Sequence, residues 1–87
     1  MIAPSLTING TSGDALVDGY TTAAQAVMDA LRALDDCDPN GRDYSEVAYP
    51  VARDEHHKRI NCLRGVLSDL QRLAEHVQGQ IDARSRR

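Results

Sequence analysis

The sequence predicts an all-α fold, a two-helix antiparallel hairpin with an extended N-terminal arm that assembles into an oligomeric helical bundle. Two long segments repeat apolar residues at alternating spacings of four and three, which is typical of amphipathic helices. A short connection with Pro and Gly separates them, and helices joined in this way normally fold back on each other. The 87 residues include no Phe and no Trp, so one hairpin has little to bury. We expect residues 1–10 to form the arm and residues 11–87 the hairpin.

The first helix is expected over residues 12–36. Thr11 or Ser12 can accept a backbone N–H as the N-cap, and Asp14 suits the first turn. The expected apolar seam consists of Leu16, Tyr20, Ala23, Val27, Ala30 and Leu34, widened by Leu31. A flank beside the seam carries only small residues, namely Gly19, Ala23, Ala26, Ala30 and Ala33. Because small side chains let another helix backbone approach, we interpret this flank as a close-packing face.

Residues 37–49 are expected to form a loop, and the second helix is expected over residues 50–84. Pro39 cannot continue the first helix, and Asp38-Pro39-Asn40-Gly41 has the composition of a β-turn. Proline is favoured at a first helical position, so Tyr49-Pro50 is the expected start of the second helix. Its seam is expected to consist of His56, Ile60, Leu63, Leu67, Leu70, Ala74, Val77 and Ile81.

The two helices differ in length, and this difference predicts self-assembly. At 1.5 Å per residue the first spans roughly 35 Å and the second roughly 50 Å. We expect the overhang to carry Val77 and Ile81, which the first helix cannot cover. Two helices also bury only one side of each other. A symmetric dimer that forms a four-helix bundle is therefore the expected assembly, and the chain's first partner is itself.

Charge and hydropathy exclude several classes of protein. The formal net charge of -3, with acids and bases mixed, disfavours a general nucleic-acid binder. No stretch approaches the ~20 apolar residues of a membrane span, and the start lacks the features of a signal peptide. We expect a cytoplasmic protein whose two cysteines, Cys37 and Cys62, stay reduced.

No pattern in the sequence predicts an enzyme, a metal site or a cofactor. His56 and His57 are adjacent and point about 100° apart on a helix, so they do not chelate as an i,i+4 pair would. Cys62 and Ser45 are possible nucleophiles, but no motif places either beside a base and an orienting group. We expect no catalytic residue and no metal ligand.

The candidate ligand-binding residues lie in the loop and at the first helix start. In one interpretation, Tyr44 and Tyr49 only pack over the open end of the hairpin while Arg42 is solvated or paired. In the other, a tyrosine stacks on a flat ligand and Arg42 holds an anionic group, a combination suited to nucleotides. The "NGTSGD" segment also resembles a phosphate cradle, although it lacks the lysine of a P-loop. The candidate set is Arg42, Tyr44, Tyr49, Asn40, Thr11 and Ser12.

The "NGTS" arm at residues 9–12 and the "PNGRDY" loop at residues 39–44, set around two amphipathic helices, resemble small uncharacterised phage and prophage proteins. The resemblance implies a virus-associated role inside the host cell. One implied function is a non-enzymatic oligomeric inhibitor of host defence, which sequesters a nucleotide signal between subunits or binds a host protein. Another is a structural or assembly component of the virion, whose arm docks on a neighbouring subunit.

Overall fold

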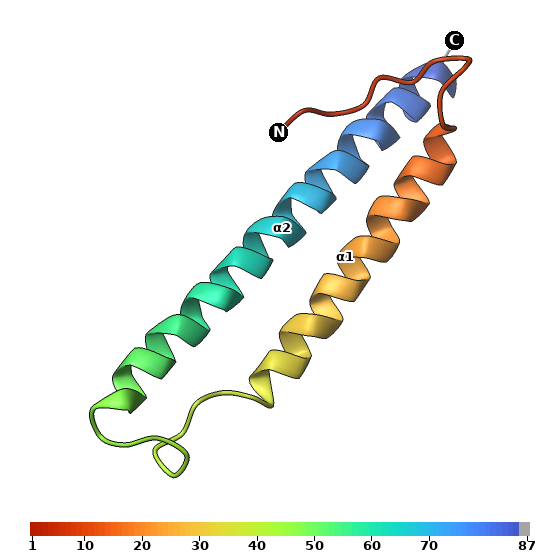
Figure 1. The fold of residues 1–87 in the computed structure, drawn as a ribbon. Helices are drawn as coiled ribbons and strands as arrows, with labels where there is room; N and C mark the ends of the chain where they lie inside the picture. Colours follow the sequence, from red (N-terminus) through yellow and green to blue (C-terminus); the bar gives the residue numbers. More distant parts are fainter. Residues whose placement is uncertain (86–87) are drawn as a thin grey trace.

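The computed structural model describes residues 1–85, and it consists of two antiparallel helices and an N-terminal arm. Helix α1 spans Gly13–Asp35 and helix α2 spans Ala48–Ser85. The hairpin is a rod of 63 × 21 × 20 Å (Figure 1). Its radius of gyration is 18.6 Å, whereas a compact domain of this length has one of about 12 Å. Within the described residues there is no strand, so the predicted all-α hairpin is confirmed.

A serine side chain caps the start of each helix. The Ser12 Oγ accepts the Ala15 N–H at 3.2 Å, as expected of an N-cap. The Ser45 Oγ accepts the Ala48 N–H at 3.1 Å, and the Ser45 carbonyl accepts the Tyr49 N–H at 2.9 Å. Helix α2 therefore begins before the predicted Tyr49-Pro50 start, because Ser45 satisfies the free N–H groups of an earlier first turn.

The loop turn lies two residues later than predicted. The carbonyl of Asn40 accepts the Asp43 N–H at 3.3 Å, so the turn runs from Asn40 to Asp43 and does not start at Asp38. The Asn40 side chain explains the shift. Its Oδ1 accepts the Arg42 N–H at 2.9 Å and its Nδ2 donates to Asp43 Oδ2 at 3.0 Å. Asn at the first position of a turn commonly makes such bonds to the backbone two residues on.

The seam of α2 is the predicted one, and the seam of α1 differs in its middle. Every expected seam residue of α2 is buried or half-buried, with His56 and Val77 fully buried. On α1 the buried alanine is Ala24, with Leu31 half-buried, whereas the expected Ala30 is exposed. A run of alanines carries no difference in hydrophobicity from which the inward position could be chosen. The larger apolar side chains before and after the alanines decide which alanine faces α2.

The overhang of α2 lies at the opposite end from the one predicted. A Cβ on Gly13 would lie 2.8 Å from Ile81 Cγ1, so the start of α1 is level with the end of α2. Val77 is fully buried, which contradicts the expectation that α1 could not cover it. The extra turns of α2 are its first ones. Residues 36–47 run beside them instead of crossing directly between the helices (Figure 1).

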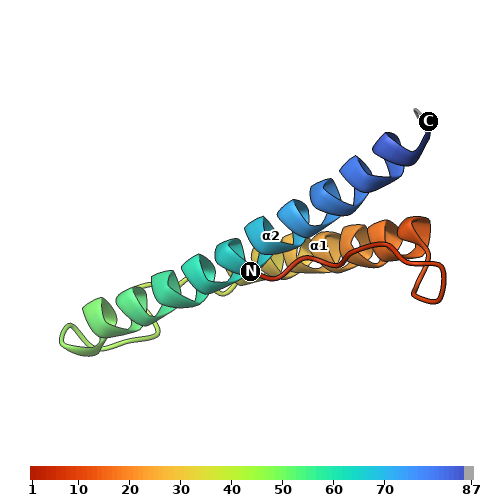
Figure 2. The ribbon, with the colours of Figure 1, turned by 90° about the horizontal axis from the view of Figure 1, so that it is seen from above.

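The arm is extended and is held by the hairpin. The Leu6 N–H donates to Gln80 Oε1 at 2.9 Å, and Gln80 Nε2 donates to the Pro4 carbonyl at 2.8 Å. Arg84 Nη2 donates to the Leu6 carbonyl at 2.8 Å. In Figure 1 the arm passes in front of α2 near its C-terminal end, and Figure 2 shows the arm beside the two helices on that same side. The arm forms no strand within residues 1–85.

Candidate functional site

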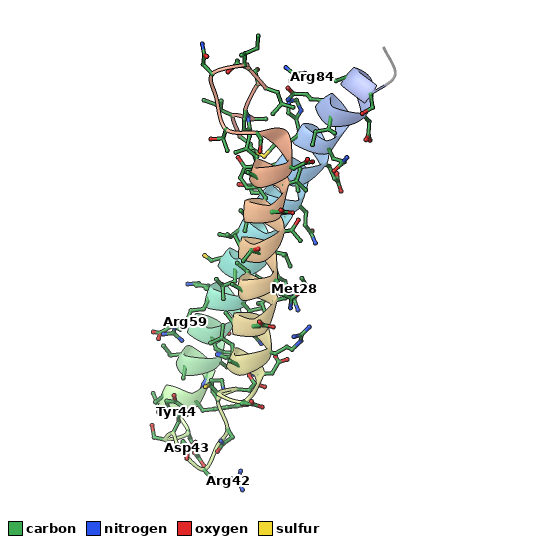
Figure 3. All side chains as sticks on the ribbon, turned by 90° about the vertical axis from the view of Figure 1, so that its right-hand side faces the viewer. Met28, Arg42, Asp43, Tyr44, Arg59 and Arg84 are labelled. Atoms are coloured by element: carbon green, nitrogen blue, oxygen red, sulfur yellow. The ribbon has the colours of Figure 1, made fainter. Side chains whose placement is uncertain are left out.

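Arg42 and Tyr44 lie in the loop, but they do not form one pocket in a single chain. Tyr44 lines an open, mainly apolar depression of about 380 Å³ together with Val47 and Val51. Arg42 is exposed, does not line this depression, and extends from the far tip of the rod (Figure 3). None of the ion pairs found within residues 1–85 includes Arg42. Its guanidinium is therefore free to meet a group that comes from outside the chain.

Tyr49 and Asn40 are occupied with structural contacts. Tyr49 is half-buried, and the Arg53 guanidinium carbon lies 5.9 Å from the centre of its ring. That distance is within the range of a cation–π contact. The Asn40 side chain holds the loop turn through its bonds to Arg42 and Asp43. Neither residue offers a free recognition surface toward the depression that Tyr44 lines.

Thr11 and Ser12 lie at the other end of the rod from the loop residues. Helix α1 has 23 residues and separates them from the loop, a distance of about 35 Å along its axis. Ser12 is engaged as the N-cap, and Thr11 is exposed. One chain therefore does not bring Thr11 and Ser12 together with Arg42 and Tyr44. A pocket with both sets needs a second copy.

His56 is a buried polar side chain that the sequence places in the seam and disfavours as a metal ligand. It is 3% exposed, and its Nε2 lies 3.3 Å from Asp38 Oδ1. The distance would allow an ion pair with a protonated imidazole, yet Nε2 makes no hydrogen bond. We regard the contact as close packing beside an exposed carboxylate.

A polar depression of about 400 Å³ opens next to this histidine. Its lining residues are Asp35, Asp38, His57, Ile60, Asn61 and Arg64. The side chains carry charges of both signs, which suits no single ligand charge. Within residues 1–85, no group of three His, Cys, Asp or Glu side chains is placed to hold a metal ion.

The hairpin has two chemically different flanks. In an antiparallel pair of right-handed helices, the positions one residue before each seam position fall on one side, and those one residue after it fall on the other. Asp35 of α1 lines the polar depression together with Arg64 of α2, so these side chains share a flank. Figure 3 shows Met28 on that side, with Arg59 and Tyr44 on the opposite side.

We call the flank with Arg59 and Tyr44 the apolar flank. Its α1 part is the predicted small-residue stripe, and its α2 part carries aliphatic side chains among a few polar ones. A helical projection of both helices would have revealed this flank. The apolar residues of this flank are Gly19, Ala23, Ala26, Ala30 and Ala33 of α1 with Ala48, Val51, Ala52, Cys62, Val66 and Leu73 of α2. Arg59, Asp69 and His76 lie between the apolar residues of α2.

Comparison with known proteins does not assign the chain to a family. No protein-family model, no curated protein and no solved structure matches it. Neither helix in residues 1–85 combines the length and the apolarity that crossing a membrane requires.

Proposed function

We propose that this chain is a non-enzymatic binding protein that functions as a homo-oligomer. The uncovered surface of the single hairpin supports the proposal. The chain exposes 6475 Å², whereas a compact 9.5-kDa protein exposes about 5,000 Å². The difference of about 1,400 Å² exceeds the roughly 800 Å² that each partner contributes to a standard interface.

The small number of buried side chains supports the same proposal. Among residues 1–85, only Ala24, His56 and Val77 are buried. Small domains with so little interior usually depend on a metal, disulfides or a partner subunit. Cys37 and Cys62 are both free and exposed. A second copy is the remaining source of stability that this chain can itself supply.

The ligand that we propose is an anionic nucleotide held between subunits, as in an inhibitor that sequesters a host defence signal. Arg42 has no ion-pair partner within residues 1–85, and Tyr44 keeps 43% of its surface exposed. Guanidinium and aromatic groups together suit a phosphate attached to a flat base. If a second copy lies antiparallel to the first, Thr11 and Ser12 of that copy come to the loop end.

The experiment is a nucleotide-binding screen on the purified protein, followed by substitution. Linear and cyclic nucleotides are tested by calorimetry, with stoichiometric binding expected for one of them. Arg42→Ala should reduce the affinity at least tenfold and leave the solution mass unchanged. Arg72→Ala is the matched control, because Arg72 is also exposed but lies on the outer side of α2. The nucleotide proposal is contradicted if the wild type binds no nucleotide, or if both variants lose binding equally.

A second candidate function is a structural or assembly component of a virus particle. Its support is the arm, where Ile2 is 96% exposed and Ile8 is 99% exposed. A neighbouring subunit could cover these two side chains. This function requires the protein to be present in purified particles in fixed ratio to the major shell protein. Its absence from the particles, with a host protein captured in its place, would favour an inhibitor directed at that protein.

A further inference from the structure

The apolar flank runs the length of the rod and has a projection at one end and a hollow at the other. The arm projects beside the last turns of α2, where Gln80 and Arg84 bind it. The hollow is the depression of about 380 Å³ beside the first turns of α2, lined by Tyr44, Val47 and Val51. Between them Val66 is 47% exposed. The small-residue stripe of α1 lies beside this part of α2 on the same flank.

We propose that a second copy covers the apolar flank with its rod antiparallel to the first, so that each arm lies beside Val51 at the partner's hollow and leaves the Tyr44 ring to the proposed ligand. The two-fold axis passes close to Val66, which packs on the same residue of the other copy. This inference rests on the proposed homo-oligomer and specifies its interface. It specifies which flank forms the interface, in which direction the partner's rod runs, and where the two-fold axis lies.

The chemistry of the flank selects a second copy as its occupant. The α1 stripe from Gly19 to Ala33 carries no charged side chain, and a Cβ on Gly19 would meet nothing within 4 Å. On α2, Glu55 is paired with Arg59 at 3.6 Å and Arg84 is bonded to the arm. The excess exposed surface of the whole chain, about 1,400 Å², is large enough to include a subunit interface. The charged side chain of this flank that has no ion-pair partner within residues 1–85 is Asp69, one position before the seam residue Leu70. An identical flank has the same length and otherwise the same lack of unpaired charge.

The direction of the partner follows from the projection and the hollow. Two face-to-face arrangements have two-fold symmetry, one with parallel rods and one with antiparallel rods. Parallel rods would place both arms at one end of the interface, where they would compete for space and hold the other ends apart. Antiparallel rods place each arm, with the exposed Met1 and Ile2, at the partner's hollow beside Val51.

The position of the axis follows from where the arm and the hollow lie along α2. The arm contacts α2 at Gln80, and the hollow is lined by Ala52. Residues that face each other across an antiparallel pair lie equally far from the axis, so the axis lies at about residue 66. On α1 this level falls between Ala26 and Ala30, where small side chains permit close approach of the partner's α1.

The test measures distances between spin labels in the full-length chain. The background carries Cys37→Ser and Cys62→Ser, and a single cysteine is placed by Val66→Cys or by Asp54→Cys. The Val66 label lies at the axis, so the expected separation of the pair is under about 20 Å. Asp54 lies on the outer side of α2, twelve residues from the axis, so its pair should be at least about 36 Å apart along the rod.

Each other outcome overturns a defined part of the account. Similar distances at the two positions mean parallel rods, and a long distance at Val66 means that another face pairs. Either result overturns this inference and leaves the proposed homo-oligomer intact. If neither position gives a measurable distance and the mass is that of one chain, both the inference and the proposed function are wrong. The unlabelled cysteine-free chain must keep the mass of the wild type for the comparison to count.

Discussion

A Cβ built on Gly13 would lie 2.8 Å from Ile81 Cγ1, which is closer than side-chain carbons pack. Leu6 Cδ1 would lie 3.0 Å from the same Cβ. The arm, the start of α1 and the end of α2 therefore meet at one point, and a residue without a side chain makes this possible. The contact fixes the register of the hairpin, with residue 13 level with residue 81.

The first prediction concerns this contact. Gly13→Ala should lower the free energy of unfolding by about 1 kcal/mol, because the added methyl forces Ile81 and Leu6 to move. Gly65→Ala is the control, since a Cβ there would meet nothing within 4 Å. It should raise the free energy of unfolding by about 0.5–1 kcal/mol through helix propensity. Urea unfolding at one protein concentration measures both, and stabilisation by Gly13→Ala would contradict the close contact.

The second prediction concerns the buried imidazole. His56→Leu should leave the free energy of unfolding unchanged or raise it by about 1 kcal/mol, because it removes a buried Nε2 that has no hydrogen-bond partner. Asp38 remains exposed and hydrated in that variant. His56→Ala should lower the free energy of unfolding by about 2–4 kcal/mol, since it leaves a cavity in the seam. Unfolding followed by circular dichroism gives both values. A large loss in the leucine variant would show that His56 has a polar role.

The third prediction concerns the arm. Gln80→Ala removes two hydrogen bonds to the arm, each worth about 0.5–1.5 kcal/mol. Hydrogen exchange at the Leu6 amide should become at least about tenfold faster, while the seam amides of α2 keep their protection. Gln78→Ala is the matched control, because Gln78 Nε2 donates only to Asp82 Oδ1, at 3.0 Å on an exposed surface. Equal acceleration in both variants would mean that Gln80 does not hold the arm.

The sequence predicted the features that depend on local patterns. The seam of α2 from His56 to Ile81 follows a regular spacing of large apolar residues, and every predicted member is buried or half-buried. The Ser12 cap follows from the preference of serine for the end of a helix. Both features are decided within a few residues of chain.

The errors arose where the outcome depends on distant parts of the chain. The sequence predicts an overhang at Val77 only if the connection between the helices is direct, whereas the loop runs along the first turns of α2. The sequence suggests Ser45 only as a possible nucleophile, whereas in the structure it caps α2, which begins just after it in the chain. The docking of the arm on Gln80 joins residues more than seventy positions apart, which no local pattern records.

The residues of the candidate site stay a prediction from the sequence, and the structure of one chain does not bring them together. Arg42 and Tyr44 are exposed in the loop, whereas Tyr49 is engaged with Arg53 and Ser12 caps α1. The sequence gives residue types that suit a nucleotide. Whether those residues converge depends on how two copies are placed, because a rod of 63 Å keeps its ends apart.

The fourth prediction tests self-association, on which the proposed function and its interface depend. Light scattering coupled to size-exclusion chromatography, at micromolar concentration, should give a mass at least twice that of the 9.5-kDa chain. Val66→Asp should shift the protein toward the single-chain mass, because it places a charge at the centre of the apolar flank. A folded wild-type species of 9.5 kDa at that concentration would contradict the account.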